Sequence, residues 1–246
     1  MSFARAFFDL QIEFARRAGE LADIPLPEAV RRFTNLPALI GIGGPDRDAL
    51  WDDLVRLTPA LTRVDDLAAD LHVRYLAFAA ANPVDMRRAQ FGCFALEYPH
   101  RGTRKARLHF RNAEPPGVSP LSAARRQARR DELKALSRFA CERCDGLEIM
   151  RGGSWLYNVG AYRRLFPPAY LGTAEVVEHE PNYMSTWGQF LAADGSVRAS
   201  GAAQLRLGLS AADSVADCLA AFPLAKLQLE CPYEAFVDHY LDPDLE

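Results

Sequence analysis

The spacing of apolar residues changes once along the chain, near residue 85. Before that point, apolar side chains recur every three or four positions. The first such series contains Phe3, Phe7, Leu10 and Phe14. From residue 90 to residue 111, apolar and polar side chains alternate instead. A period of about 3.6 is typical of amphipathic helices, and a period of two is typical of strands. The pattern therefore predicts a helical N-terminal region, 1–85, and an α/β GNAT-like domain, 86–246, as two parts or as one compact unit.

The N-terminal region is expected to contain helices only. The helical period predicts helices over about 2–22, 29–36, 50–57 and 63–81. Ser2 for the first helix, and Asp46 or Asp48 for the third, are candidate N-caps, because their side-chain oxygens can accept hydrogen bonds from the unpaired N–H groups of a first turn. Phe7 and Phe14 lie on the apolar stripe of the first helix. We therefore expect replacement of either by Ala to lower the free energy of unfolding by about 3–5 kcal/mol.

Two alternating segments, 90–98 and 104–111, are separated by a turn-like segment, 99–103, and together predict a β-hairpin. With Phe94 opposite Leu108, one face of this hairpin is apolar. The other face then carries Cys93, Glu97, Lys105, Arg107, His109 and Arg111. A shift of the pairing by one residue would mix the two faces, so the alternation itself fixes this grouping.

Beyond the hairpin, strands and helices are mixed. Ser119 and Pro120 suit the N-cap and first position of a helix that runs to about residue 144. Residues 224–229 suit a strand or a helix. The other predicted strands are 147–150, 173–177 and 183–191, and the other predicted helices are 160–166, 198–209, 212–221 and 233–240. We expect an α+β fold, with a helical N-terminal layer packed on a mostly antiparallel, acyltransferase-like sheet with flanking helices.

Composition excludes some classes of function. The formal net charge is −3 and the sequence pI is about 6.0, which argues against general nucleic-acid binding. No apolar run reaches the roughly 20 residues that span a bilayer. Asp9 interrupts the first apolar residues, where a signal peptide would stay apolar. We therefore expect a cytoplasmic protein with no membrane or nucleic-acid partner.

The five cysteines point to reduced thiols, because their number is odd and no secretion signal is expected. Cys141 and Cys144 form an isolated C-x-x-C motif. A structural zinc site needs four ligands, and no second close pair is present. The motif also lies at the predicted end of a helix rather than at its start, so we expect no metal and read the pair as coincidental.

His109 is the candidate for acid–base chemistry, because imidazole titrates near neutral pH. The alternative is a histidine that only hydrogen-bonds the next loop. Cys93 is either a nucleophile opposite His109 or a small core residue. Arg107, Arg111 and Arg151 suit a carboxylate or phosphate. The candidate ligand-binding residues are Arg111, Asn112, Arg151, Ser154, Trp155, Tyr157 and Trp187.

Several segments of the chain together resemble a group of bacterial proteins that share the RGGSWLYN motif and have no established activity. The segments are Phe91-Gly-Cys-Phe94, His109-Phe-Arg-Asn112, Arg151-Gly-Gly-Ser-Trp-Leu-Tyr-Asn158, Tyr162–Tyr170 and Trp187-Gly-Gln-Phe190. This resemblance covers most of the chain and implies no particular reaction.

Residues 105–191 more distantly resemble the GNAT-like C-terminal domain of bacterial acyltransferase-type proteins. The shared order is a strand ending in His109, a helix opening near Pro120, a strand ending near Ser154, a short helix and an aromatic-rich segment. The resemblance implies an acyltransferase-like fold with acyl-CoA as a candidate cofactor. The Gln/Arg-x-x-Gly-x-Gly/Ala loop that binds the cofactor pyrophosphate in that family is missing here, so the cofactor stays unassigned.

Two functions therefore remain open. The first is an acyltransferase-like enzyme for an unknown small molecule, with His109 as general base and Arg111 and Arg151 as anion clamps. The orienting groups would be Asn112, Ser154 and Tyr157. The second is a non-catalytic module that binds a ligand or a protein partner through the same residues. Either function requires His109, Arg111, Ser154 and Tyr157 to converge on one pocket.

Overall fold

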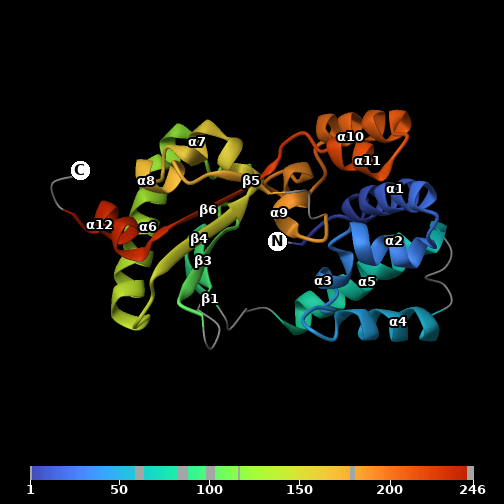
Figure 1. Ribbon diagram of the computed structural model, residues 1–246, viewed down its shortest axis with the longest axis horizontal. Helices are drawn as coiled ribbons and strands as arrows, with labels where there is room; N and C mark the ends of the chain where they lie inside the picture. Colours follow the sequence, from blue (N-terminus) through green and yellow to red (C-terminus); the bar gives the residue numbers. More distant parts are fainter. Residues whose placement is uncertain are drawn as a thin grey trace. The chain divides into compact units, whose positions relative to one another are not determined.

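The chain folds into two compact units and passes between them three times. The computed structural model describes residues 2–58, 64–82, 88–97, 103–115, 117–177 and 181–242. Met1–Val84 and His179–Leu224 form the helical unit, and Asp85–Glu178 and Ala225–Glu246 form the sheet unit (Figure 1). The sequence pattern placed one division near residue 85. It assigned 179–224 to the sheet domain, whereas this segment returns to the helical unit.

The helical unit has no strand among its described residues before residue 82, as expected. Its first part contains α1 (Arg5–Ala22), α2 (Leu26–Phe33), α3 (Leu36–Leu39), α4 (Arg47–Leu57) and α5 (Val64–Ala81). The returning segment adds α9 (Met184–Trp187), the 3-10 turn η4 (Gly188–Phe190), α10 (Ala199–Ala211) and α11 (Val215–Ala220). The N-cap of α1 is Ala4 rather than Ser2, and Asp46 precedes α4 without a side-chain capping bond.

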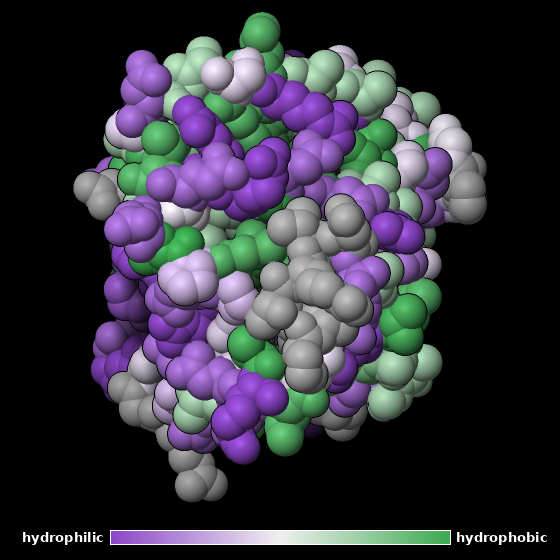
Figure 2. All heavy atoms as spheres, turned by 90° about the vertical axis from the view of Figure 1, so that its right-hand side faces the viewer, coloured by the Kyte–Doolittle hydropathy of each residue, from purple (hydrophilic) through white to green (hydrophobic). Residues whose placement is uncertain are grey.

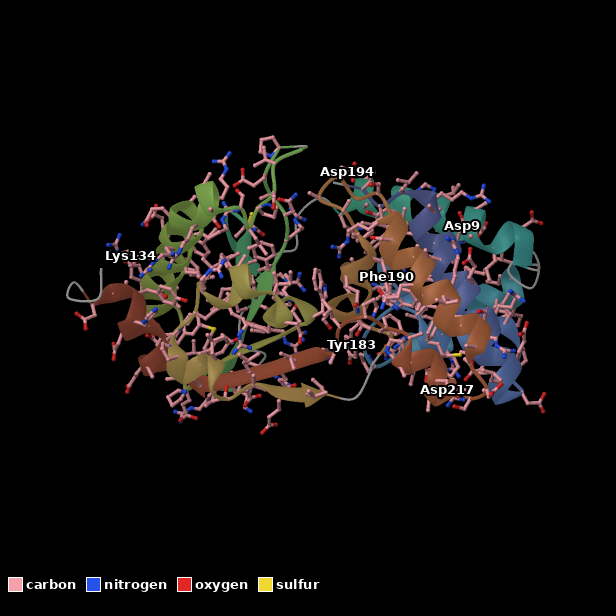
Figure 3. The ribbon with its side chains drawn as sticks, turned by 90° about the horizontal axis from the view of Figure 1, so that it is seen from above. Asp9, Lys134, Tyr183, Phe190, Asp194 and Asp217 are labelled. Atoms are coloured by element: carbon pink, nitrogen blue, oxygen red, sulfur yellow. The ribbon has the colours of Figure 1, made fainter. Side chains whose placement is uncertain are left out.

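The expected strand over 183–191 is wrong, because this segment forms α9 and η4. Met184, Trp187 and Phe190 recur every three residues, which suits helical turns, whereas in a strand successive members of this series would lie on opposite faces. Trp187 and Phe190 are fully buried, and their ring centroids lie 5.7 Å apart. Phe190 is labelled among the helices in Figure 3. Burial of both rings on one side is what selects the helical form.

The core of the helical unit is an aromatic cluster that joins the two parts of its chain. The indole of Trp187 lies 5.4 Å from the ring of Phe14 and 5.0 Å from the ring of Phe222, between centroids. Its Nε1 donates a hydrogen bond to the carbonyl of Pro181 at 2.5 Å. Phe7 and Phe14 of α1 are also fully buried. Edge-to-face contacts of this kind hold the returning segment against α1.

The surface of the helical unit carries scattered apolar side chains. Figure 2 looks onto this unit and shows hydrophobic patches separated by hydrophilic ones. The exposed large apolar residues in the described part of the unit include Leu50, Leu57, Val73, Leu76, Phe78 and Leu207. Such residues are normal on protein surfaces when they are dispersed. None of the described helices combines the length and the apolar character needed to cross a bilayer.

The sheet unit is built on a six-stranded mixed sheet. Its strands are β1 (Arg88–Phe91), β2 (Phe94–Glu97), β3 (Lys105–Phe110), β4 (Ile149–Ser154), β5 (Glu175–Val177) and β6 (Lys226–Pro232). Their order across the sheet is β1-β2-β3-β4-β6-β5. Only the pair β3 and β4 is parallel, so the described sheet is mostly antiparallel. The ambiguous segment near 224–229 lies mainly in β6.

The one parallel pair requires a crossover, which the turn η2 (Ala123–Arg125) and helix α6 (Arg126–Arg143) supply. Helix α6 begins later than Ser119 and Pro120 suggested. In the hairpin, Phe94 lies opposite Phe110 and Leu96 lies opposite Leu108. This register differs by two residues from the expected one. A shift of two keeps every side chain on its predicted face, so the face assignment is unchanged.

Helices cover the apolar face of the sheet. They are α6, η3 (Trp155–Asn158), α7 (Gly160–Arg163), α8 (Pro168–Leu171) and α12 (Tyr233–Leu241). Figure 1 shows α6, α7, α8 and α12 grouped beside the strands. Gly152 of β4 lies on this face. Its missing side chain leaves room for the hydroxyls of Tyr157 and Tyr170, which are 2.9 Å apart and hydrogen-bonded. The two buried hydroxyl groups therefore supply each other's hydrogen-bond partner in the space that Gly152 leaves open.

Gly152→Ala should destabilise the sheet unit. An added Cβ would lie 2.1 Å from the hydroxyl of Tyr157 and 2.2 Å from that of Tyr170. Overpacking of this kind costs about 1–3 kcal/mol of unfolding free energy. Gly153→Ala is the matched control, because the nearest atom to its Cβ would be Lys226 Cε at 3.7 Å. Equal denaturant midpoints for the two variants would contradict this packing.

Phe14→Ala should lower the free energy of unfolding by about 3–5 kcal/mol, because it opens a cavity beside Trp187. Leu207→Ala on α10 is the control, since Leu207 is 72% exposed. A urea unfolding curve, monitored by tryptophan fluorescence, gives the free energy of unfolding of both variants. An unchanged midpoint for Phe14→Ala would show that the aromatic cluster does not stabilise the helical unit.

Candidate functional site

The second face of the sheet carries a row of charged side chains. Residues opposite one another on neighbouring strands share a face of the sheet. One such row crosses five strands, and we call it the charged row. It consists of Arg88, Glu97, Arg107, Arg151 and Glu230. Arg107 and Arg151 are neighbours at its centre, on the parallel strands β3 and β4. Two adjacent positive charges in this position suit an anionic group.

The charges of the row are only partly compensated. Glu230 lies 3.2 Å from Arg151 and 2.9 Å from Lys105, between charged atoms. Arg151 also donates a hydrogen bond to Gln228. Arg107 is exposed and forms no ion pair with any residue that the structure describes. The centre of the charged row therefore has a guanidinium group available to a carboxylate or phosphate.

His109 lies beside this row and pairs with Glu97. Its Nε2 is 2.5 Å from Glu97 Oε2, and the side chains of His109 and Glu97 are only 25% and 13% exposed. The hydrogen bond from His109, with help from Arg88 and Arg107, lowers the pKa of Glu97 to about 2. Burial, followed by the charges of the same arginines, lowers the pKa of His109 despite the opposing effect of Glu97.

These shifts define the protonation state of the pair. At neutral pH, Glu97 is a carboxylate and His109 is a neutral imidazole that donates its Nε2–H to Glu97. The lone pair then lies on Nδ1, which is the atom able to accept a proton. A carboxylate that fixes the tautomer of a histidine is a recurring device for orienting a general base.

Cys93 does not face His109, because the residue opposite His109 is Ala95. Cys93 lies in the turn between β1 and β2 and is buried. Its Sγ accepts hydrogen bonds from Arg129 Nη1 at 2.6 Å and from the amide of Ala113 at 3.4 Å. Burial raises the pKa of the thiol. The nucleophile–base pair considered from the sequence is therefore absent, and Cys93 helps to anchor α6.

The expected convergence of His109 with Ser154 and Tyr157 is wrong. Tyr157 lies under Gly152 on the apolar face, whereas His109 lies on the charged face. Ser154 Oγ accepts a hydrogen bond from the amide of Leu156 at 3.1 Å and so caps η3. The chain turns over the apolar face directly after β4, and strand alternation does not predict such a turn.

The other ligand candidates are dispersed. Trp187 lies in the core of the helical unit, not in the sheet unit. Asn112 Oδ1 accepts a hydrogen bond from the amide of Glu114 at 3.0 Å, as in an Asx turn. Trp155 is partly buried in η3, and Arg111 is exposed after β3. Of the predicted residues, His109 and Arg151 lie on the charged face, together with Arg107 and Glu97.

A second basic site lies at the start of α6. A cavity of about 120 Å³ is lined by Leu121, Ser122, Ala123, Arg126, Arg129, Ala161, Arg164 and Leu165. Arg126 and Arg164 are exposed and form no ion pair with described residues. The first turn of α6 has no acidic residue and no side-chain capping bond. Because helix N-termini favour anions, arginines here create a strongly positive position.

An unusual feature of the sequence, a group of arginines at the start of a helix, marks this cavity. Arg125, Arg126, Arg129 and Arg130 crowd the first turns of α6, where acidic residues are normally favoured. A run of basic residues along a helix is usually a solvated face. Arg129 departs from that interpretation, since it is buried and bonds Glu114 at 2.9 Å and Glu132 at 2.5 Å.

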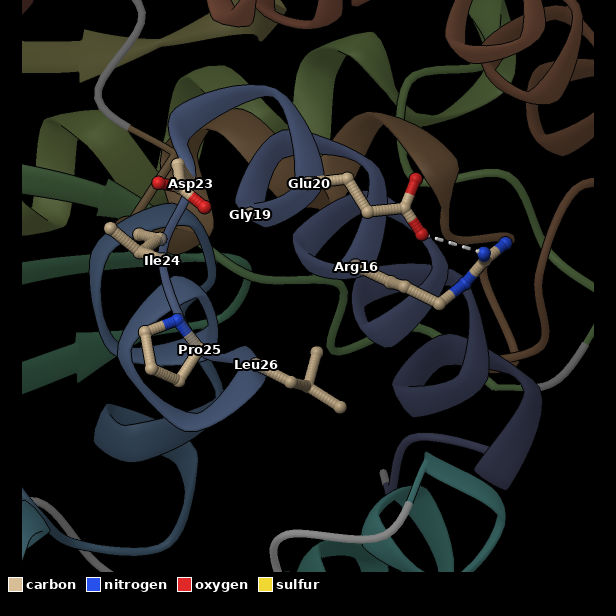
Figure 4. A pocket seen from close by; sticks show the side chains of 7 residues that line it. All are labelled: Arg16, Gly19, Glu20, Asp23, Ile24, Pro25 and Leu26. Atoms are coloured by element: carbon tan, nitrogen blue, oxygen red, sulfur yellow. Dashed lines mark hydrogen bonds and ion pairs between the residues drawn. The ribbon is translucent and has the colours of Figure 1, made fainter.

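A wider hollow of about 390 Å³ lies between α1 and α2 of the helical unit (Figure 4). Its lining residues are Arg16, Gly19, Glu20, Asp23, Ile24, Pro25 and Leu26. Arg16 and Glu20 pair with each other at 3.0 Å, so their charges are already matched. The hollow therefore offers less recognition chemistry than the charged face.

In the described part of the chain, no three His, Cys, Asp or Glu side chains are grouped so that they could hold a metal ion. Comparison of the chain with known protein families, with curated proteins and with solved structures found no match.

The pKa of His109 should respond in opposite directions to two substitutions. Glu97→Gln removes the carboxylate that raises this pKa, so the pKa should fall further below its ordinary value. Arg107→Ala removes a charge that lowers it, so the pKa should rise. An NMR titration of the histidine ring signals measures both effects, and the His239 signals are the internal control. Shifts of the same sign in both variants would contradict the geometry.

Proposed function

We propose that the chain is an acyltransferase-like enzyme that acts on a small anionic molecule, with His109 as the general base. The observation that carries this proposal is the Glu97–His109 pair beside Arg107 and Arg151. A neutral histidine held by a carboxylate can remove a proton from an amine or hydroxyl group. The two arginines can hold a carboxylate or phosphate of the same molecule in place.

The topology of the sheet supports a site in this position. Ligands of α/β proteins commonly bind beyond the carboxyl ends of parallel strands. The pairing of β3 with β4 stops at Leu108 and Gly152, although both strands continue for two more residues. His109 lies in the end of β3 that β4 does not pair, opposite Ala95 of β2. A mixed sheet with one parallel pair, crossed by a helix, is also in keeping with the GNAT-like relationship inferred from the sequence.

The cavity at the start of α6 supports a donor that carries phosphate. Its walls come from the segments that follow β3 and β4 in the chain, on helices that also cover the apolar face of the sheet. A volume of about 120 Å³ holds roughly four water molecules, which is too little for a complete drug-sized ligand. It would anchor one charged group. Arg126 and Arg164 would bind such a group without the family's glycine-rich loop.

In the proposed reaction, Nδ1 of His109 accepts the proton of the attacking amine or hydroxyl group as the new acyl bond forms. Glu97 stabilises the imidazolium that results. Arg107 and Arg151 orient the acceptor, which lowers the entropy that must be lost in reaching the transition state. The donor's leaving group departs with its charge held near the start of α6.

A non-catalytic binding module is the alternative, and the small size of the α6 cavity favours it. The two functions share the arginines but differ at His109. A binding module needs the charge and shape of the site, whereas an acyltransferase also needs a proton acceptor. Substitution of His109 therefore separates them.

His109→Gln should abolish transfer while leaving the fold intact, because Gln can still donate a hydrogen bond to Glu97 but cannot accept a proton as imidazole does. We expect turnover to fall by about 10²–10⁴-fold. The assay follows release of free thiol from acetyl-coenzyme A in the presence of amino acids and amino-sugar phosphates, which carry both an amine and an anionic group. Arg138→Ala, an exposed position elsewhere on α6, is the matched control.

Binding of coenzyme A, measured by calorimetry, tests the donor site independently. Arg126→Ala combined with Arg164→Ala should weaken it by about a hundredfold or more, because the loss of each charge-assisted contact costs about tenfold or more. Binding without any transfer by the native chain would favour the binding module. Full transfer activity in His109→Gln would exclude His109 as the base.

A further inference from the structure

The C-x-x-C motif lies in the last turn of α6. Cys141 is helical, and the amide of Cys144 still donates a hydrogen bond to the carbonyl of Ala140 at 3.0 Å. Residues three apart in a helix lie on the same side, with Cα atoms about 5 Å apart. Disulfides join Cα atoms separated by about 4.4–6.8 Å. The backbone therefore holds the two cysteines within bonding range.

The backbone at the end of the helix also allows the two Cβ atoms to approach each other. Cβ atoms three residues apart in a helix are about 5–6 Å apart, whereas a disulfide requires about 3.5–4.5 Å. Cys144 has φ −119° and ψ 66°, so it has already left the helical conformation. Gly146 follows with φ 72° and turns the chain. Because Cys144 is no longer in the helical conformation, its Cβ is not held at the helical spacing from the Cβ of Cys141.

The two thiols have different surroundings. Cys141 is exposed, whereas Cys144 is buried, and burial raises the pKa of Cys144. The hydroxyl of Tyr233 donates a hydrogen bond to Cys141 Sγ at 3.2 Å. The pKa of Tyr233 is raised first by burial, then by this bond and by the nearby thiols of Cys141 and Cys144. The Cys141 sulfur therefore lies against a hydroxyl group at the surface of the sheet unit, whereas Cys144 lies beneath the surface.

We propose that Cys141 and Cys144 form a dithiol site that reacts with low-molecular-weight disulfides of the glutathione type. The Cys141 thiol loses its proton and attacks one sulfur of the disulfide, releasing the first small thiolate. Cys144 then loses its proton and attacks Cys141 Sγ, releasing the second. Two protein thiols and one small disulfide become one protein disulfide and two small thiols, and the two protons pass to the released thiolates. The site goes beyond the proposed acyl transfer and uses none of its residues.

Oxidation of the two cysteines would change the contacts at the start of α12. Tyr233 is the first residue of α12, and its amide donates a hydrogen bond to the carbonyl of Glu148 at 2.8 Å. Movement of Cys141 Sγ toward Cys144 would weaken the bond from the Tyr233 hydroxyl. The contact between the end of α6 and the start of α12 is therefore the part of the sheet unit that the reaction changes.

Peptide mapping of the folded chain after treatment with oxidised glutathione tests the proposal. Trypsin cleaves after Arg138, Arg143 and Arg151, so the two cysteines lie on separate peptides, 139–143 and 144–151. We expect these two peptides to be joined, with a loss of about 2 Da and no retained glutathione. A reducing agent should separate them again.

Cys144→Ser should stop the reaction at the first step. Glutathione should then stay on Cys141, at a level about tenfold or more above that in the native chain. Cys218→Ala removes a buried thiol of the helical unit and should leave the joined peptides unchanged. Persistent glutathione on native Cys141, or a disulfide between Cys141 and any cysteine other than Cys144, would overturn the proposal. An absence of reaction at Cys141 would overturn it as well.

Discussion

Each strand must divide its side chains between two faces of the sheet, and this constraint decides which residues of the sheet unit can act together. Leu108 and Gly152 lie over the buried tyrosines, while their neighbours His109 and Arg151 lie on the charged face. Residues that are adjacent in sequence are thereby separated by the thickness of the sheet. Residues far apart in sequence, such as Glu97 and Glu230, become members of one row.

The sequence predicted those parts of the fold that depend on local periodicity. Alternation placed His109, Arg107 and Glu97 on one face, and the two-residue error in register did not change this. Four of the five described helices before residue 82 were predicted for the same reason, and the short helix α3 was not. Trp187 was misplaced because the aromatic residues of its short segment favour a strand, whereas their three-residue spacing fits a helix. Only its packing against Phe14 and Phe222 distinguishes the two.

The candidate site was less predictable because it depends on which partner each charge meets. Lys105 and Arg107 lie on the same face of the hairpin as Glu97 and could each pair with it, but Glu97 pairs with His109, and Lys105 pairs with Glu230. Partners across a sheet depend on strand order, and strand order is a long-range property. The position of Tyr157 also depends on a contact that the local pattern does not show. After Ser154 the chain turns over the apolar face, and the hydroxyl of Tyr157 occupies the space that the missing side chain of Gly152 leaves.

The path of the chain between the units constrains the order in which they can be completed during synthesis. Strand β6 lies between β4 and β5, yet it is made after all of α9, α10 and α11. On the ribosome, β5 has no hydrogen-bonded neighbour in the sheet until β6 emerges, whereas the residues of the helical unit are by then all present. Since domains generally fold as units during translation, the helical unit can fold first, and the sheet is completed only when β6, the last of its described strands, has been made.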